Sequence, residues 1–416
     1  MSQVLAQDGV DSTPNARPRV LITESIPRSN VPTPTPTPLI DGRPVVIISN
    51  TSVQRTAPKT YPTVVPVPQN SNQTDEFRSL PYNELIARID EAKRTMQTKP
   101  LRISQTDSDQ TTEVVRIAFY DWTNRRVDYA VVMKSLFLDT DYSITSRSEF
   151  GQVVRVQTIR GNGVNTPVKL FDVYNRPLLP LIVQYPIEKF GSFNEMAYYV
   201  STHPGIETPE VVSVGRTYVH NVVETARERL REKGIFIQPK IADMAEKLAL
   251  VEHVDHYRFR NEYHPKIYND VYTLYALNRG QTYRYAVSSA GAGGMVQMIP
   301  ATYRMIRSRY YSVGLIPDFV TGMRDHVNAS EAMLLYMQMT WNDLISNSTV
   351  FDAVSSGIAT QEELMAAGYN SNPARLPGYI RRGGESWATL IPRETKIYLQ
   401  ILSSVERFVP FTPRTK

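Results

Sequence analysis

The sequence predicts an α+β protein with a disordered Pro/Thr-rich N-terminal tail, a small β-rich domain and an α-helical C-terminal domain. Three changes in composition along the chain support this prediction. The first 80 residues hold 12 of the 29 prolines. β-Branched and aromatic residues between Gly, Asn and Pro breaks dominate residues 113–186, as is typical of short strands. From Pro239 onward, apolar residues recur at helical spacing.

These changes divide the chain into five segments. Residues 1–80 are expected to be a disordered Pro/Thr-rich tether, and residues 81–110 a short helix with a linker. Residues 111–190 are the small β-rich domain, residues 191–236 a helical connector, and residues 237–416 the C-terminal domain, which carries every candidate site residue. A chain of 416 residues is long enough for two or three domains.

The composition excludes several classes of function. The chain has no cysteine, which rules out disulfide scaffolds, iron–sulfur clusters, thiol catalysis and cysteine-based zinc sites. The net charge of +5, from 46 basic and 41 acidic residues, is too small for a dedicated nucleic-acid binder, so we expect no nucleic-acid partner. No apolar run reaches the roughly 18 residues needed to cross a bilayer, so we expect no transmembrane segment.

The N-terminal tail alternates proline and threonine from Pro32 to Pro38, a pattern that favours extended polyproline II structure and indicates a tether. Two short apolar segments, 44–49 and 64–67, could instead add a strand to another body. Residues 4–7 (Val-Leu-Ala-Gln) resemble the end of an export signal whose apolar core is absent from the sequence as given. An ordinary polar N-terminus is the alternative interpretation.

A short helix and a hairpin are predicted next. Residues 80–92 place a stripe of apolar side chains on one helical face, namely Leu85, Ile86, Ile89 and Ala92. Residues 114–122 and 127–138 are rich in β-branched and aromatic side chains and flank a polar turn at 123–126. We therefore expect these two segments to pair as a β-hairpin.

The remaining elements are assigned by the same patterns. Residues 152–160 and 168–185 continue the β-rich domain, in which no residue pattern indicates catalysis. Residues 193–200 and 218–232 are expected to be helical. From residue 239 to about 408 we expect helices joined by irregular loops, without an internal repeat.

A carboxylate lies on the apolar face of the helix that begins at Pro239. The stripe on that face follows the spacing of a core-facing helix and consists of Ile241, Met244, Ala245, Leu248 and Ala249. Glu252 occupies the next position of the stripe. Burial raises the pKa of a carboxyl group, and an acid that keeps its proton near neutral pH is suited to general acid catalysis. The alternative is that Glu252 lies at the edge of the stripe and reaches solvent.

Three further segments contain residues suited to a binding site. Residues 287–302 form a Gly/Ala loop in which the glycines permit close backbone approach and Gln297 offers an uncharged amide. The pair Tyr369 and Asn370 precedes a Pro/Arg turn. Residues 391–398 begin a helix that has a proline near its first turn.

Taken in this order, the four segments resemble the catalytic domain of soluble lytic transglycosylases, a lysozyme-like fold that is also similar to goose-type lysozyme. The family pattern is a Glu-bearing helix, a Ser-x-x-Gly-Ala-x-Gly-Leu-Met-Gln-x-Met-Pro loop, Ala-Tyr-Asn-Ala-Gly-Pro and a Pro-x-Glu-Thr-x-x-Tyr helix. This chain has Ser-Ser-Ala-Gly-Ala-Gly-Gly-Met-Val-Gln-Met-Ile-Pro at 288–300, Gly-Tyr-Asn-Ser-Asn-Pro at 368–373 and Pro-Arg-Glu-Thr-Lys-Ile-Tyr at 392–398. The resemblance covers residues 237–416 and leaves residues 1–236 without a counterpart.

The resemblance implies a peptidoglycan lytic transglycosylase, a carbon–oxygen lyase that cuts between N-acetylmuramic acid and N-acetylglucosamine and forms a 1,6-anhydro product. Glu252 would be its single catalytic acid and base, and Ser288, Gln297, Tyr369 and Asn370 would bind the substrate. The implied partners are peptidoglycan glycan strands, with no cofactor and no metal. We therefore expect a periplasmic or extracellular protein whose tail or β-rich domain is a candidate attachment to a cell-envelope assembly.

The chain departs from the family pattern after the catalytic Glu, which is usually followed by Ser and here precedes His253. Ser288 lies 36 residues after Glu252, farther than in the family, because of an insertion at 253–287. The insertion is rich in tyrosine, which either lines a sugar-binding cleft or packs around extra helix: Tyr257, Tyr263, Tyr268, Tyr272, Tyr275, Tyr283 and Tyr285. Glu262 is a second candidate for the acid, although no apolar helix precedes it.

Three alternative functions stay open. A metal site would use His253 and His256 with His264 nearby, although the spacing differs from the His-Glu-x-x-His zinc motif. A non-catalytic peptidoglycan-binding or assembly module of the same fold would bind the cell wall without releasing product. A lysozyme-type muramidase would hydrolyse the same bond with a second carboxylate, for which Asp255 is the candidate because it lies one turn from Glu252.

Overall fold

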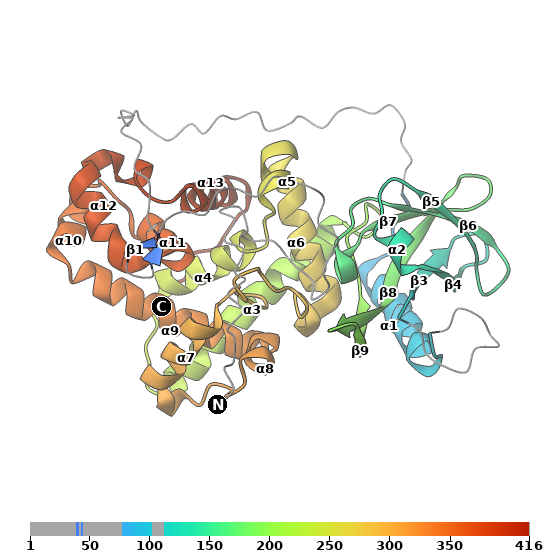
Figure 1. Ribbon diagram of the computed structural model, residues 1–416, viewed down its shortest axis with the longest axis horizontal. Coiled ribbons are helices and arrows are strands. Elements are labelled where there is room, and N and C mark those ends of the chain that lie inside the picture. Colours follow the sequence, from blue (N-terminus) through green and yellow to red (C-terminus); the bar gives the residue numbers. More distant parts are fainter. Residues whose placement is uncertain (1–38, 41–42, 45–76, 102–111, 416) are drawn as a thin grey trace, which may run out of the picture.

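The computed structural model describes residues 39–40, 43–44, 77–101 and 112–415. The predicted tether at 1–80, with its apolar segments and its export-like start, lies almost entirely outside these residues. The described residues comprise an antiparallel sheet and a set of α-helices, which confirms the α+β class (Figure 1). Within them, no helix is long and apolar enough to cross a membrane.

A seven-stranded antiparallel sheet has the order β4-β3-β8-β7-β6-β5, and β9 pairs with β8. Its strands are β3 Val114–Asp121, β4 Arg126–Met133, β5 Ser143–Arg147, β6 Val153–Thr158, β7 Val168–Phe171, β8 Pro177–Lys189 and β9 Ser192–Tyr199. A separate pair is formed by β1 Leu39–Ile40 and β2 Arg43–Pro44. β3 and β4 form the predicted hairpin, in which the Asp121 carboxylate accepts the N–H groups of Thr123 and Asn124 in the turn.

Helix α1, Tyr82–Thr98, packs against β8 through the predicted apolar stripe. Leu85, Ile89 and Ala92 are buried, whereas Ile86 is only partly so, and the stripe continues to Met96. β3 is buried at every position, which explains why its side chains do not alternate between apolar and polar; its two charged residues, Arg116 and Asp121, are buried as well. The second strand of the hairpin was predicted to reach residue 138, but β4 ends at Met133 and a short helix, α2 Lys134–Phe137, follows it.

The segment predicted to be a helix at 193–200 is strand β9, so this prediction is wrong. A tight turn joins β8 to β9, and in it Phe190 and Gly191 both have positive φ, 55° and 75°, as hairpin turns require. β9 then pairs along its length with β8. This pairing overrides the helix propensity of the Asn-Glu-Met-Ala run, and the sheet extends past the predicted limit at residue 190.

The predicted connector contains one helix, α3 Pro209–Glu232, which begins before the expected residue 218 at an N-cap formed by Thr208. The expectation of helices from residue 239 onward is confirmed. They are α4 Pro239–Val251, α5 His256–Asn261, α6 His264–Asn278, α7 Pro300–Arg309, α8 Phe319–Arg324, α9 His326–Ile345, α10 Ser348–Ser355, α11 Gln361–Asn370, α12 Leu376–Gly383 and α13 Arg393–Phe408. Helix α9 is buried over most of its length and contacts α3, α4, α7, α8, α10 and α11, so it is the central helix of this part.

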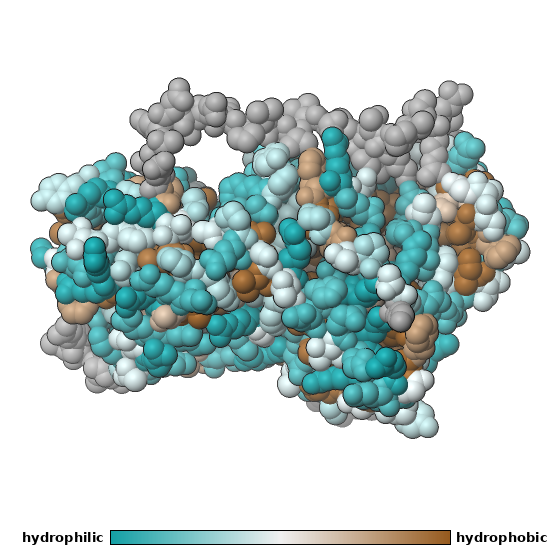
Figure 2. Space-filling model, turned by 180° about the vertical axis from the view of Figure 1, so that it is seen from behind, coloured by the Kyte–Doolittle hydropathy of each residue, from teal (hydrophilic) through white to brown (hydrophobic). Residues whose placement is uncertain are grey.

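The sheet and the helices share one continuous apolar core, which runs from residues such as Phe119 and Tyr185 to Leu248 in α4. Val200, the residue directly after strand β9, makes a polar connection between them. The Asn278 side chain exchanges two hydrogen bonds with the backbone of Val200, at 2.9 and 2.8 Å. Hydrophilic side chains cover most of the face shown in Figure 2, where apolar side chains reach the surface in separate patches.

A buried arginine anchors the C-terminal segment. The Arg414 guanidinium, 6% exposed, pairs with Asp243 at 2.8 Å, with Glu246 at 2.7 Å and with Glu224. Asp243 and Glu246 lie in α4, whereas Glu224 lies in α3. Arg414 therefore neutralises carboxylates from two helices at once, one of which leads to Glu252.

We expect Arg414→Ala to lower the free energy of unfolding by about 3 kcal/mol, because it leaves the buried Glu246 and the half-buried Asp243 without this cation. Glu224 is 40% exposed, so its pair adds little. The urea midpoint measures the effect. Arg407→Ala is the control, since Arg407 is exposed and lies in the same region, and it should change stability by less than about 0.5 kcal/mol. Equal midpoints for the two variants would contradict the assignment.

His203 is a buried titratable group between the sheet and α3. It is 2% exposed, and its Nδ1 accepts the N–H of Gly205 at 3.0 Å. Burial lowers the pKa of His203 from about 6.5 to about 3. The native state therefore keeps this imidazole neutral at pH values where the unfolded chain binds a proton.

This difference predicts a pH dependence of stability. As the pH falls from about 6.5 to about 3, proton uptake by unfolded His203 removes up to about 1.4 kcal/mol of stability per pH unit. His203→Asn keeps an acceptor for Gly205 and does not titrate, so its stability should fall less steeply between pH 6 and pH 4. Urea unfolding of both proteins across this range provides the measurement. Parallel curves would show that native His203 binds its proton normally.

Candidate active site

Glu252 lies at the C-terminal end of α4. The predicted stripe of this helix is fully buried: Ile241, Met244, Ala245, Leu248 and Ala249 are each at most 1% exposed. Glu252 is the C-cap residue, its N–H donates to the Leu248 carbonyl at 2.9 Å, and it is 2% exposed. The alternative in which this side chain reaches solvent at the stripe edge is therefore wrong.

A tyrosine of α13 holds the Glu252 carboxyl group. The Tyr398 hydroxyl donates to Glu252 Oε1 at 2.7 Å, and Tyr398 is 1% exposed. This residue is the tyrosine of the Pro-x-Glu-Thr-x-x-Tyr segment. One turn earlier in α13, Thr395 Oγ1 donates to Asn370 Oδ1 at 2.9 Å. Because residues three apart on a helix differ by only about 4.5 Å in rise, α13 brings Glu252 and Asn370 close together.

The Gly/Ala loop has a defined and strained backbone. The Ser288 hydroxyl accepts the Ala292 N–H at 3.0 Å, and Ser288 itself is 5% exposed. Gly294 has φ of 68°, and a Cβ atom there would lie 2.4 Å from the Met323 carbonyl oxygen, so only glycine fits. Gln297 has φ of 45°, which is rare for a residue with a side chain. Such strain persists only where surrounding contacts fix the loop.

Two side chains hold consecutive carbonyl groups of this loop. The Tyr369 hydroxyl donates to the Val296 carbonyl at 2.7 Å, and the His253 Nε2–H donates to the Met295 carbonyl at 2.8 Å. Tyr369 comes from α11 and His253 directly follows Glu252. The two hydrogen bonds therefore bring the residue after Glu252 and the C-terminal end of α11 to the same stretch of the loop, just before Gln297.

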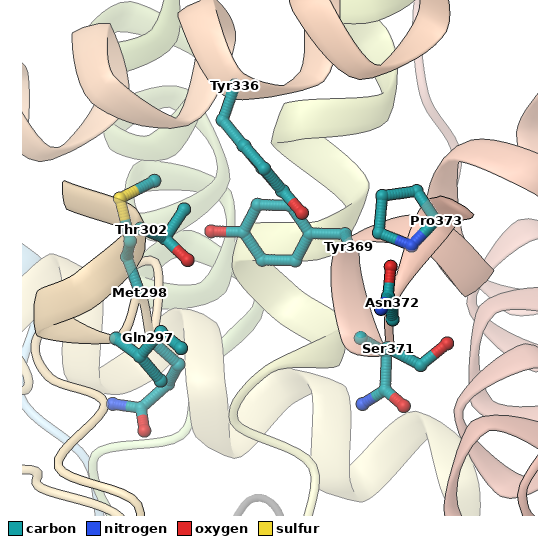
Figure 3. Close-up of a pocket in the computed structure, with 10 residues that line it drawn as sticks. Gln297, Met298, Thr302, Tyr336, Tyr369, Ser371, Asn372 and Pro373 are labelled. Atoms are coloured by element: carbon teal, nitrogen blue, oxygen red, sulfur yellow. The ribbon is translucent and has the colours of Figure 1, made fainter. Parts of the chain in front are cut away.

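A cavity of about 380 Å³ opens beside these contacts (Figure 3). Its lining residues are Gln297, Met298, Ile299, Thr302, Tyr336, Tyr369, Asn370, Ser371, Asn372 and Pro373. In Figure 3, Gln297 and Met298 lie on one side of the Tyr369 ring, and Ser371 and Asn372 lie on the other. Among the described residues the lining carries amides, hydroxyls and aromatic rings and no ionised side chain, so it suits a neutral polar ligand.

The predicted site residues thus occupy three kinds of position. Gln297, Tyr369 and Asn370 line the cavity. Glu252 is buried and is connected to the cavity wall through α13, without being one of its lining residues. Ser288 does not line the cavity either, and its hydroxyl shapes the loop by binding the Ala292 N–H.

The tyrosines of the insertion mostly serve packing. Tyr268, Tyr272, Tyr275 and Tyr283 are each at most 3% exposed and belong to the apolar core. Burial raises the pKa of Tyr268 and Tyr272 above its usual value. For these four residues the packing interpretation is confirmed. Tyr257 is 70% exposed and does not belong to this core.

The alternative carboxylates are engaged elsewhere. Asp255 caps α5, where its Oδ1 accepts the Arg258 N–H at 2.8 Å. Glu262 forms an ion pair with Arg258 at 2.7 Å and is about one third exposed. Neither carboxylate shares the enclosed position of Glu252. Within the described residues, Glu252 is therefore the candidate acid that the geometry favours.

Two of the three histidines of the predicted metal site, His253 and His264, bind backbone carbonyls. His264 Nε2 donates to the Phe259 carbonyl at 2.8 Å, much as His253 does to Met295. Burial lowers the pKa of His253 to about 3 and that of His256 to about 4. In the part of the chain that the structure describes, no group of three or more His, Asp or Glu side chains is placed to hold a metal ion.

Sequence reasoning missed several functional positions. Tyr398 and Thr395 belong to the Pro-x-Glu-Thr-x-x-Tyr segment, and its spacing is the signal that places both on one helix face. Tyr336 carried no such signal, because α9 reads as an ordinary core helix. Its ring lies edge-on to Tyr369, with ring centroids 5.8 Å apart.

We expect Tyr398→Phe to lower the free energy of unfolding by about 1.5–3 kcal/mol, because it removes a donor to a buried carboxyl group. Glu252→Gln and the double variant complete a mutant cycle. The two single changes should be non-additive, since they affect the same hydrogen bond. Additive effects in chemical denaturation would contradict a direct interaction.

Comparison with models of known protein families, with curated proteins and with solved structures finds no match to this chain.

Proposed function

We propose that this protein is a peptidoglycan lytic transglycosylase, which cleaves the bond between N-acetylmuramic acid and N-acetylglucosamine. One observation carries the proposal. The four segments that resemble this family are connected by hydrogen bonds, from Tyr398 to Glu252, from His253 to Met295 and from Tyr369 to Val296. These contacts join residues 146, 42 and 73 positions apart and bring the four segments together around the buried Glu252 carboxyl group, beside a neutral polar cavity.

The buried position of Glu252 suits a group that must first give and then take a proton. Protonated Glu252 donates to the glycosidic oxygen as the bond from C1 to that oxygen breaks, and N-acetylglucosamine leaves with a new hydroxyl. The N-acetyl group of the muramic acid supports the positive charge that develops at C1. Carboxylate Glu252 then accepts the proton of the 6-hydroxyl, whose oxygen bonds to C1. The acid is regenerated, and no water is consumed.

The chemistry of the cavity fits an N-acetylated sugar. Gln297, Asn370 and Asn372 offer amide groups that can bond acetamido and hydroxyl groups of the ligand. Tyr336 and Tyr369 provide aromatic surface for the apolar faces of sugar rings. The volume of about 380 Å³ falls within the range of roughly 300–1,000 Å³ typical of small-ligand sites.

Asp255 gives no support to a two-carboxylate hydrolase. A glycoside hydrolase places its two carboxyl groups on opposite sides of the scissile bond, about 5–9.5 Å apart. Asp255 caps α5 with its Oδ1, so its orientation is set by that helix. A single acid and base assisted by the substrate's own N-acetyl group fits the described residues better.

The proposed function implies a periplasmic or extracellular location, where peptidoglycan lies. Glycan strands are then the main partner. The β-rich domain contributes none of the described residues that line the cavity, so it is a candidate attachment to a cell-envelope assembly, as is the N-terminal tail.

We expect Glu252→Gln to reduce release of anhydro-muropeptides from purified sacculi by at least about 100-fold, because the isosteric amide cannot donate the proton. Glu262→Gln is the matched control, and it should release product at the wild-type rate because Glu262 is ion-paired away from the cavity. Mass spectrometry of the soluble products provides the measurement.

The same experiment separates the competing functions. Undiminished release by Glu252→Gln would refute the assignment of the acid. Wild-type products one water heavier than the anhydro form would identify a muramidase. Binding to sacculi without soluble product would identify a non-catalytic module.

A further inference from the structure

The residue after Glu252 has a well-defined environment of its own. The His253 ring lies flat against the Tyr283 ring, with centroids 3.4 Å apart and planes 2° apart. The edge of Tyr275 contacts the same imidazole, with centroids 6.4 Å apart. His253 is 7% exposed, so the stack is closed to solvent. Such enclosure leaves the ring a single orientation.

The hydrogen bond of His253 fixes its tautomer. A carbonyl oxygen only accepts, so the contact with Met295 at 2.8 Å requires the proton on Nε2. Burial lowers the pKa of His253 to about 3, which keeps the ring neutral at physiological pH. His253 Nδ1 is buried and has no hydrogen-bond partner among the described residues. The imidazole therefore acts through Nε2 and its flat faces, without a charge.

The carbonyl that His253 binds belongs to the strained part of the loop. Met295 lies between Gly294 and Gln297, whose φ values are 68° and 45°. Tyr369 binds the next carbonyl, that of Val296. Two side chains from different parts of the chain therefore hold adjacent peptide groups of the loop. Of these two, His253 is the next residue in the chain after Glu252.

We infer that His253 is a positioning residue, which sets the position of the Gly294–Met298 loop, and so of Gln297, relative to Glu252. The part of this inference that concerns activity rests on the proposed function. His253 is also the position at which this chain departs from the family it resembles, because Ser usually follows the Glu there. The His253 ring connects the end of α4 to the loop through a single hydrogen bond, the one to the Met295 carbonyl.

Two substitutions separate the hydrogen bond from the ring. His253→Phe keeps a flat ring against Tyr283 and removes the donor to Met295. His253→Gln removes the ring and keeps an amide N–H near the place of Nε2. His264→Phe is the matched control, because His264 also stacks on an aromatic ring, that of Phe259 at 4.1 Å, and donates Nε2–H to a carbonyl.

The first readout is amide hydrogen exchange, which needs no substrate. The N–H groups of Ala292, Gly293 and Gly294 bond to Ser288 Oγ and to the carbonyls of Met298 and Ala286. We expect their exchange to quicken in His253→Phe and to stay close to wild type in His253→Gln and His264→Phe. Unchanged protection of these amides in His253→Phe would overturn the inference, whether or not the protein is a transglycosylase.

The second readout is the rate of anhydro-product release at saturating substrate. His253→Phe should release product about 10- to 100-fold more slowly, the effect of a displacement of about 1 Å at a reacting centre. His253→Gln should recover most of that loss, and the pH dependence should be the same in all variants, because His253 is neutral. Equal losses in the Phe and Gln variants would overturn the positioning role. A wild-type protein without anhydro product would refute the proposed function alone, since exchange still tests the loop.

A third variant covers failure of His253→Phe to fold. His253→Asn removes the ring as the Gln variant does, but its amide reaches only the place of Nδ1. The inference requires faster exchange in the Asn variant than in the Gln variant. Identical exchange in the two would contradict it.

Discussion

The burial of one carboxyl group at the end of α4 is the constraint on which the rest of the site depends. An acidic side chain that is 2% exposed is costly unless hydrogen-bonded groups surround it, and Tyr398 supplies such a group from the far end of the chain. α13 must therefore lie against α4, as their contacts show. Arg414 fastens the segment after α13 to the same helix. The C-terminal region of the chain is thus part of the environment of Glu252.

The sheet supports the site from the other side. Glu195 of β9 pairs with Arg284 at 3.2 Å and with Arg324 at 2.9 Å, and these arginines flank the Gly/Ala loop in sequence. The Tyr199 hydroxyl accepts the N–H of Tyr283, whose ring stacks on His253. β9 is thus linked to His253, the residue next to Glu252, through Tyr283. Through these contacts the β-rich domain supports the Gly/Ala loop and Tyr283, whether or not the domain itself binds a ligand.

Much of the site could be predicted from local patterns, and the rest depended on tertiary contacts. The apolar stripe of α4 placed Glu252 on a buried face, because helix periodicity is a property of the sequence alone. Gln297, Tyr369 and Asn370, which stand in two of the motif segments, line a common cavity. β9 was predicted as a helix because the local propensity of its Asn-Glu-Met-Ala run favours one, whereas pairing with the preceding strand β8 decides its conformation. Tyr336 could not be predicted, since its role comes from the crossing of α9 with α11.

The continuous core between sheet and helices also bears on how such a protein can change over evolutionary time. Because β9 continues directly into the contacts around Asn278, the sheet cannot be exchanged for another module by recombination at a simple linker. A chain without the sheet would need compensating changes in α6 and the loop after it, because Asn278 and Tyr283 would lose their hydrogen-bond partners. The two halves are therefore expected to be inherited as one unit.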